Sequence, residues 1–168
     1  IKTLCDAAFG ATGAWTRDDV VVFTPHGSSP LYRVSASGGA PEPATTLNAA
    51  DGETQHSSPF FLPDGRHFLY FVVGSKSGGM TYARGIYVGA LGSTAPGRLL
   101  VDGGTNPKYA DGHLLFLRDG ILLAQRFDPD RLQLEGQPRP LAERIQMATT
   151  GATEVAGAFS VSASARNA

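Results

Sequence analysis

The chain contains 168 residues, 42% of them hydrophobic, and its 14 basic and 15 acidic residues give a formal net charge of -1 at pH 7. This apolar content is enough to bury a core, while the balanced charge without a basic block excludes the electrostatic footprint of a nucleic-acid-binding protein and disfavours contact with a membrane. The 21 glycines and 11 prolines predict many turns and few long helices, and the single cysteine, Cys5, excludes an intrachain disulfide and a thiolate metal cluster.

The N-terminal part predicts one isolated strand followed by a four-stranded unit. Residues 1–5 are expected to be the outer strand of a preceding unit. The first complete unit covers residues 11–48 and begins with two apolar stretches on either side of Asp18. Its third strand is expected at residues 31–35, where polar and apolar residues alternate, and its fourth at residues 44–47, after a turn rich in Gly and Pro.

The middle of the chain, residues 57–102, holds the clearest copy of the same pattern. Residues 60–71 consist of an apolar stretch, an Asp64-Gly65 turn and a second apolar stretch. Because Gly after Asp supplies the positive φ that a tight turn demands, this pattern predicts an antiparallel hairpin. The third and fourth strands of this unit are expected at residues 86–90 and 98–101.

The stretch between the second and third strands of this unit, residues 74–84, is expected to be a long loop. Binding residues are often carried by such loops, so Met80, Tyr82 and Arg84 are candidates for a contact surface. The same stretch superficially resembles a serine-nucleophile elbow. However, Lys76 occupies the middle position, where that motif needs its nucleophile, so the motif is rejected.

The last complete unit is predicted at residues 106–143, with its first turn at Asp111-Gly112. Two segments are candidates for its fourth strand, residues 132–134 and residues 140–142, and the pattern does not decide between them. Residues 157–163 are expected to be the inner strand of a following unit.

The turn aspartates of the three units recur at a nearly constant interval. Asp18, Asp64 and Asp111 lie 46 and 47 residues apart, within the range of roughly 40 to 50 residues that is typical of propeller blades. The sequence therefore predicts one all-β segment over residues 1–168, a partial β-propeller of about three complete four-stranded antiparallel blades plus flanking strands. Because so few blades do not close a ring, we expect a second copy or the rest of a longer chain to complete it.

The repeated positions predict structural roles for most of the polar and aromatic residues that stand out. Asx side chains bond nearby backbone amides, so the turn residues are expected to stabilise hairpins rather than to act as catalytic carboxylates. These residues are Asp18, Asp64, Gly65, Asp111 and Gly112. Near the ends of the inner strands, Trp15, Phe61 and Tyr109 are expected to pack between neighbouring blades.

The four histidines do not form a convincing metal-binding pattern. His67 and His113 occupy the same position after the turn in two units, and this repetition favours a structural role. His26 and His56 fall in predicted loops and receive no assignment. No catalytic residue, metal ligand or cofactor is therefore predicted, and the chain itself is expected not to be an enzyme.

The segment Leu62-Pro63-Asp64-Gly65-Arg66, followed by an apolar strand and then by Gly85-Ile86-Tyr87-Val88, resembles the TolB-type, WD-repeat-like propeller family. Blades of that family typically carry Ser-Pro-Asp-Gly, and Leu62 stands here in place of the serine. Residues 31–36, 61–70 and 125–128 more narrowly resemble the C-terminal propellers of bacterial serine/threonine protein kinases. The resemblance implies a bacterial protein at the periplasm or cell surface. Kinase catalytic motifs do not occur in the chain.

These observations lead to the expectation of a non-catalytic binding or scaffolding module, part of a larger sensor or kinase-linked protein. Its partner is expected to be a protein, a peptide or a small ligand, with no contact to nucleic acid or membrane. The alternative is the propeller portion of a prolyl-oligopeptidase-like hydrolase whose catalytic domain lies outside this chain. Propellers host unrelated functions, so the fold itself does not decide between the two.

Overall fold

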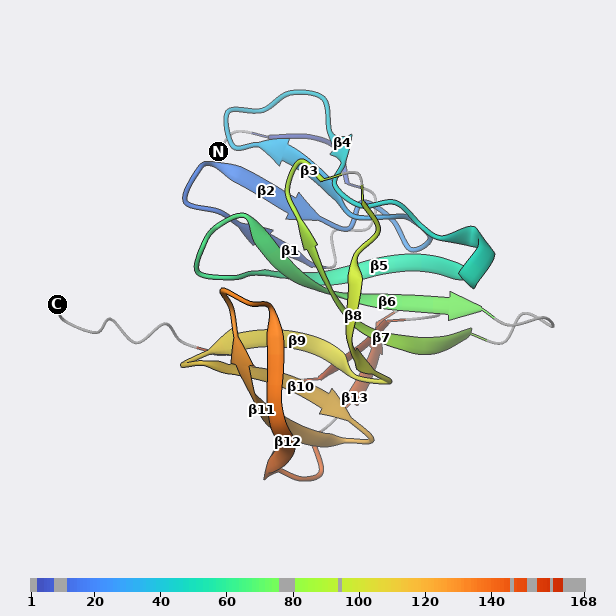
Figure 1. Cartoon of the computed structure of the whole chain (residues 1–168). Helices are drawn as coiled ribbons and strands as arrows, with labels where there is room; N and C mark the ends of the chain where they lie inside the picture. The colour runs from blue at the N-terminus through green and yellow to red at the C-terminus, as the bar shows by residue number, and fades with distance from the viewer. Residues whose placement is uncertain are drawn as a thin grey trace, which may run out of the picture.

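The computed structural model describes residues 3–7, 12–75, 81–93, 95–145, 147–150, 154–157 and 159–161. Within these residues the chain forms three four-stranded antiparallel sheets and one two-stranded hairpin, with no α-helix (Figure 1). This arrangement confirms the expected all-β, partial propeller-like fold.

The strands of each sheet follow one another in chain order. The first sheet consists of β1 (Gly13–Trp15), β2 (Val20–Phe23), β3 (Tyr32–Ser35) and β4 (Glu42–Pro43). The second consists of β5 (Glu53–Phe61), β6 (His67–Ser75), β7 (Thr81–Ala90) and β8 (Arg98–Asp102), and is preceded by the 3-10 turn η1 (Ala49–Asp51). The third consists of β9 (Thr105–Ala110), β10 (His113–Arg118), β11 (Ile121–Asp128) and β12 (Gln133–Ala142). The hairpin consists of β13 (Met147–Thr150) and β14 (Glu154–Gly157).

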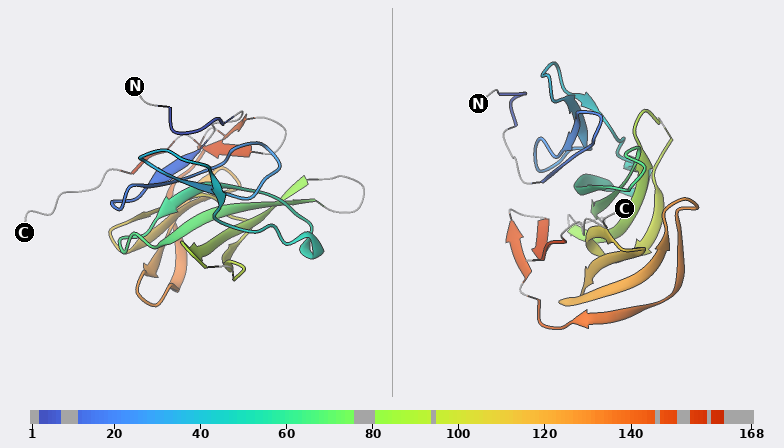
Figure 2. Two further views of the ribbon diagram at one scale, coloured as in Figure 1. Left: turned by 90° about the horizontal axis from the view of Figure 1, so that it is seen from above. Right: turned by 90° about the vertical axis from the view of Figure 1, so that its left-hand side faces the viewer.

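The sheets follow one another around an arc, as the right-hand view of Figure 2 shows. Strand β5 contacts both β1 and β9, and β9 contacts β14, so the first strands of successive sheets lie side by side. The chain then runs outward through each sheet to its fourth strand and returns to begin the next. This is the arrangement expected of propeller blades.

An apolar core fills each of the two interfaces between the three four-stranded sheets. Between the first and second sheets the core contains Val22, Leu31, Phe68, Tyr70, Val72 and Tyr87. Between the second and third sheets it contains Leu62, Leu69, Ile86, Val88, Val101, Leu114, Phe116 and Phe127. Side chains alternate between the two faces along a strand, so consecutive residues of β6 enter different cores. The continuous apolar run at residues 68–73 is thus explained by a strand that is buried on both faces.

The turn of the β5–β6 hairpin is stabilised by the side chain of Asp64. Its Oδ1 accepts hydrogen bonds from the backbone N–H of Arg66 (3.0 Å) and of His67 (2.9 Å), while Gly65 adopts φ 68°. The first turn achieves the same shape with other residues. There Thr16 Oγ1 accepts the N–H of Asp18 and of Val20, and Asp19 takes the positive φ.

Several predicted strand boundaries are wrong. The fourth strand of the first sheet is Glu42–Pro43 rather than residues 44–47, because Thr45 is instead hydrogen-bonded to Leu31 and His56. The second sheet begins at Glu53 rather than at residue 57. Both candidates for the fourth strand of the third sheet overlap one long strand, β12, which begins at Gln133, so Leu132 lies in the preceding turn.

The predicted flanking strands also differ from the structure. Residues 3–5 have no strand conformation, and residues 1 and 2 lie outside the described residues. In place of an inner strand at 157–163, the paired strand β14 ends at Gly157, and residues 159–161 are not in a strand. Residues 158, 162 and 163 lie outside the described part of the chain.

Candidate functional site

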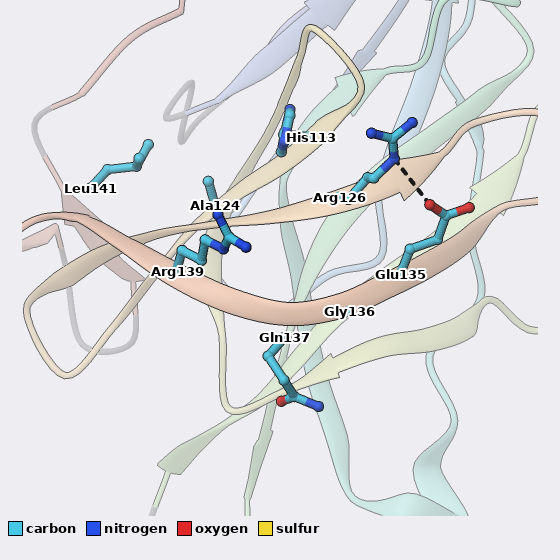
Figure 3. A pocket seen from close by; sticks show the side chains of 8 residues that line it. All are labelled: His113, Ala124, Arg126, Glu135, Gly136, Gln137, Arg139 and Leu141. Atoms are coloured by element: carbon cyan, nitrogen blue, oxygen red, sulfur yellow. Dashed lines mark ion pairs between the residues drawn. The ribbon is translucent and has the colours of Figure 1, made fainter.

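The third sheet carries an open pocket of about 760 Å³ on the face that points away from the second sheet (Figure 3). Residues of β10, β11 and β12 line it, and most of them belong to the side of the sheet that does not enter the core. They are His113, Ala124, Arg126, Glu135, Gly136, Gln137, Arg139 and Leu141, here called the third-sheet face.

Strand register places these residues together although they are far apart in the sequence. His113 is opposite Arg126 across β10 and β11, and Arg126 is opposite Glu135 across β11 and β12. Ala124 is likewise opposite Arg139. Directly opposed residues of an antiparallel pair project to the same side of the sheet. The three basic side chains therefore belong to one surface.

The hollow arises because its floor is made of small residues. Ala124 carries a single methyl group, and Gly136 adopts φ 64° at a shift of register between β11 and β12. The Nε2 amide of Gln125 donates a hydrogen bond to the carbonyl oxygen of Gly136 at 2.8 Å, which ties the irregular part of β12 to its neighbour. Such bulges redirect side chains and often lie beside binding sites.

The charges on the third-sheet face are only partly paired. Arg126 Nε lies 3.0 Å from Glu135 Oε2, and both side chains are exposed. Arg139 forms no hydrogen bond or ion pair with any residue that the structure describes. His113 donates from Nδ1 to the carbonyl oxygen of Asp111 at 2.8 Å, and its Nε2 has no hydrogen-bond partner in the part of the chain that the structure describes. Leu141 is 59% exposed and adds an apolar contact to this basic surface.

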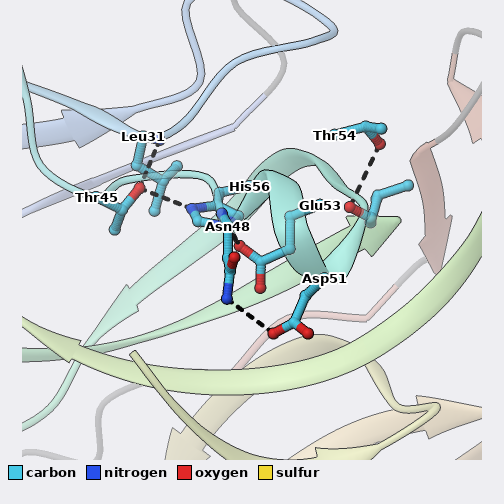
Figure 4. A network of polar contacts seen from close by, with 8 residues as sticks. Leu31, Thr45, Asn48, Asp51, Glu53, Thr54 and His56 are labelled. Carbon is cyan, nitrogen blue, oxygen red and sulfur yellow. Dashed lines mark hydrogen bonds and ion pairs between the residues drawn. The ribbon is translucent and has the colours of Figure 1, made fainter. Parts of the chain in front are cut away.

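A second group of polar residues is buried between the first and second sheets (Figure 4). The side chain of His56 is 1% exposed, and that of Glu53 is 7% exposed. His56 Nε2 lies 3.1 Å from Glu53 Oε2, and His56 Nδ1 lies 2.8 Å from Thr45 Oγ1. The Thr45 oxygen also accepts the backbone N–H of Leu31, and Glu53 Oε2 accepts that of Asn48.

This buried group has the residue types of a nucleophile, a base and an acid, but its bonds are those of a structural clamp. With the proton on Nε2, His56 donates to Glu53 and accepts from the Thr45 hydroxyl. The Thr45 oxygen is also engaged by Leu31, so its bonding capacity serves the link between the first sheet and β5. Burial, and then the nearby Glu53 carboxylate, raises the pKa of Tyr70, whose ring lies 4.9 Å from that of His56.

The other predicted site residues lie in different places. Met80 is outside the described residues, while Tyr82 and Arg84 belong to strand β7 rather than to a loop, because β6 and β7 extend as far as Ser75 and Thr81. The role of these three residues as a contact surface stays a prediction. His67 Nδ1 is 2.5 Å from Asp64 Oδ2 in the exposed β5–β6 turn.

Neither a metal site nor a membrane-spanning helix is found in the described parts of the chain. No group of three His, Cys, Asp or Glu residues gathers there as a metal ion requires. None of the helical structure described is long and apolar enough to cross a membrane.

No family model and no curated protein matches the chain. Among solved structures, a puromycin-hydrolyzing peptidase of Mycobacterium tuberculosis is similar, with a TM-score of 0.53 and 19% sequence identity. The similarity covers 78% of this chain and 23% of the peptidase chain, so the present chain corresponds to less than a quarter of that protein. At this identity the similarity shows the fold alone.

Proposed function

We propose that the chain is a non-catalytic binding module that engages a polypeptide partner through the third-sheet face. The observation that supports this proposal is the open pocket of about 760 Å³ over β10, β11 and β12, which combines exposed Leu141 with exposed arginines. Arginine is enriched where proteins bind one another, and an exposed apolar side chain gains stability when a partner buries it. The opposite face of the same sheet is closed by the core shared with the second sheet.

The proposal is tested by selecting peptide ligands from a random library and mapping where they bind. Backbone amide NMR signals of β10, β11 and β12 are expected to shift on binding, and Ala124→Arg is expected to abolish binding because it fills the hollow. A matched control is Leu99→Arg, which alters another exposed apolar residue, on β8 of the second sheet. The proposal would be contradicted if the selected peptides shifted amide signals outside β10, β11 and β12, or if they still bound the Ala124→Arg variant.

The finer assignment to the TolB-like family, and to a larger sensor or kinase-linked protein at the bacterial envelope, is also a proposal. Its support is the motif around Asp64 and Gly65 and the 46- and 47-residue spacing of the turn aspartates. The flanking sequence in the complete gene product is expected to encode a kinase domain and a membrane anchor. A complete gene product without either would refute the kinase link.

The second candidate is the propeller portion of a prolyl-oligopeptidase-like hydrolase. The observation that favours it is the structural similarity to a peptidase of which this chain corresponds to only 23%. In that case the complete gene product contains a hydrolase domain with a Gly-x-Ser-x-Gly motif. The same sequence determination therefore distinguishes the two candidates.

A further inference from the structure

The charge of the third-sheet face indicates what kind of partner it accepts. Its lining contains two arginines and one histidine against a single carboxylate, that of Glu135. Glu135 pairs with Arg126, so Arg139 is left without an acidic partner among the described residues. A planar guanidinium on an exposed surface is well suited to bind carboxylates in a bidentate manner.

The shape of the face indicates an extended ligand rather than an isolated ion. The pocket runs over three neighbouring strands and ends at β12, the edge strand of the sheet. Its volume of about 760 Å³ lies in the range of pockets that hold organic ligands. Leu141 and the methyl group of Ala124 offer apolar contacts beside the arginines. An extended peptide presents side chains alternately and so satisfies both kinds of contact.

We infer that the third-sheet face binds an extended acidic segment of a partner protein, with Arg139 and Arg126 contacting its carboxylates and Leu141 packing against its apolar side chains. This inference rests on the proposed function and names the chemistry of the partner. Glu135 acts as an internal competitor, because a carboxylate of the ligand takes the place that Glu135 holds beside Arg126 at 3.0 Å. Binding therefore breaks one exposed ion pair and forms new ones.

The test uses the full 168-residue chain and a short fluorescein-labelled peptide of alternating glutamate and leucine, followed by fluorescence anisotropy. Arg139→Gln is expected to weaken binding by about tenfold, since it removes a charge-assisted contact. Glu135→Gln is expected to strengthen binding by about threefold, because Arg126 loses its competing partner. Raising the salt concentration is expected to weaken binding to the unaltered chain.

The first sheet offers a matched control pair. Arg33 and Glu42 also form an exposed ion pair across neighbouring antiparallel strands, at 2.8 Å. Arg33→Gln and Glu42→Gln change the net charge of the molecule in the same way as the two test substitutions. Both are expected to leave the affinity for the peptide unchanged.

Three results would overturn the inference. The first is equal affinity for the peptide with glutamine in place of glutamate. The second is an unchanged affinity in Arg139→Gln. The third is displacement of the peptide by equimolar inorganic phosphate, which would indicate a simple anion site. If library-selected peptides still bind the third-sheet face but carry no acidic residues, the proposed function stands while the acidic partner is rejected.

Discussion

Two glycines illustrate how individual residues limit the sequences that this fold accepts. Gly65 has φ 68° in open space, whereas Gly85 has φ 137° and an added Cβ would collide with the Val101 carbonyl oxygen. Gly65→Ala is therefore expected to cost about 1 kcal/mol of stability through backbone strain alone. Gly85→Ala is expected to cost about 3 kcal/mol because a backbone clash is added. Chemical denaturation measures both, and equal losses would refute this account of β7.

The two histidine–carboxylate pairs are expected to differ in their contribution to stability because they differ in burial. His56→Ala removes the His56 side chain from the buried carboxylate of Glu53, which keeps its hydrogen bond from the Asn48 N–H, so a loss of about 3 kcal/mol is expected. His67→Ala breaks a largely exposed pair with Asp64 and is expected to cost less than about 1 kcal/mol. Urea denaturation of the two variants provides the comparison. A smaller loss for His56→Ala than for His67→Ala would show that the buried clamp is not stabilising.

The β5–β6 hairpin is expected to contribute to acid sensitivity through its turn. Partial burial acts to raise the pKa of Asp64, but hydrogen bonds from the His67 side chain and from the backbone N–H groups of His67 and Arg66 lower it below 3.8. A carboxyl group with a lowered pKa stabilises the folded state above its unfolded pKa, and this contribution is lost as the pH falls through the folded pKa. Asp64→Ala is therefore expected to be less stable than the unaltered chain at neutral pH.

The stability difference between Asp64→Ala and the unaltered chain is expected to shrink as the pH falls below about 3.8. Thermal unfolding followed over that pH range provides the measurement. A difference that stays constant, or that grows on acidification, would show that the ionised Asp64 does not stabilise the turn.

The elements that sequence could predict are those whose signal is local. The hairpin turn at Asp64 and Gly65 is specified by neighbouring residues, and the structure shows the expected hydrogen bonds and positive φ there. The fourth strand of the first sheet differs from the predicted one because Thr45 forms a hydrogen bond to His56, a contact distant in sequence that the pattern of residues 44–47 does not reveal. The loop predicted at residues 74–84 is longer than the segment that the structure leaves between β6 and β7. The two strands pair as far as Ser75 and Thr81, and the residues at these strand ends show no marked alternation of polar and apolar side chains that would reveal the pairing.

The candidate site was not predicted from the sequence because it depends on register. His113, Arg126 and Arg139 belong to three strands, and only the pairing of β10 with β11 and of β11 with β12 brings them together. The buried role of His56 is not evident from the sequence either, because the residue pattern predicts a loop where the structure has β5. Too few apolar or aromatic residues flank His56 in the sequence to indicate that its side chain is buried.

At the scale of the whole molecule, the aromatic and apolar residues at the interfaces between the three four-stranded sheets are buried more deeply than those on the faces that these sheets do not share. Phe61 and Tyr109 pack into the two cores, as expected from their repeated position. Trp15, the equivalent residue of the first sheet, was expected to pack in the same way, but it is 62% exposed because no described residue covers that face. Leu141 is similarly exposed, on the third-sheet face.

Hydroxyl-radical footprinting read by mass spectrometry tests most directly the central claim that the sheets stack in this order and leave the third-sheet face open. Trp15 and Leu141 are expected to be oxidised rapidly, whereas Phe68, Tyr70 and Phe116 are expected to be protected until the chain is unfolded. Rapid oxidation of Phe68 and Phe116 in the folded chain, or protection of Leu141 in the absence of a partner, would contradict the account.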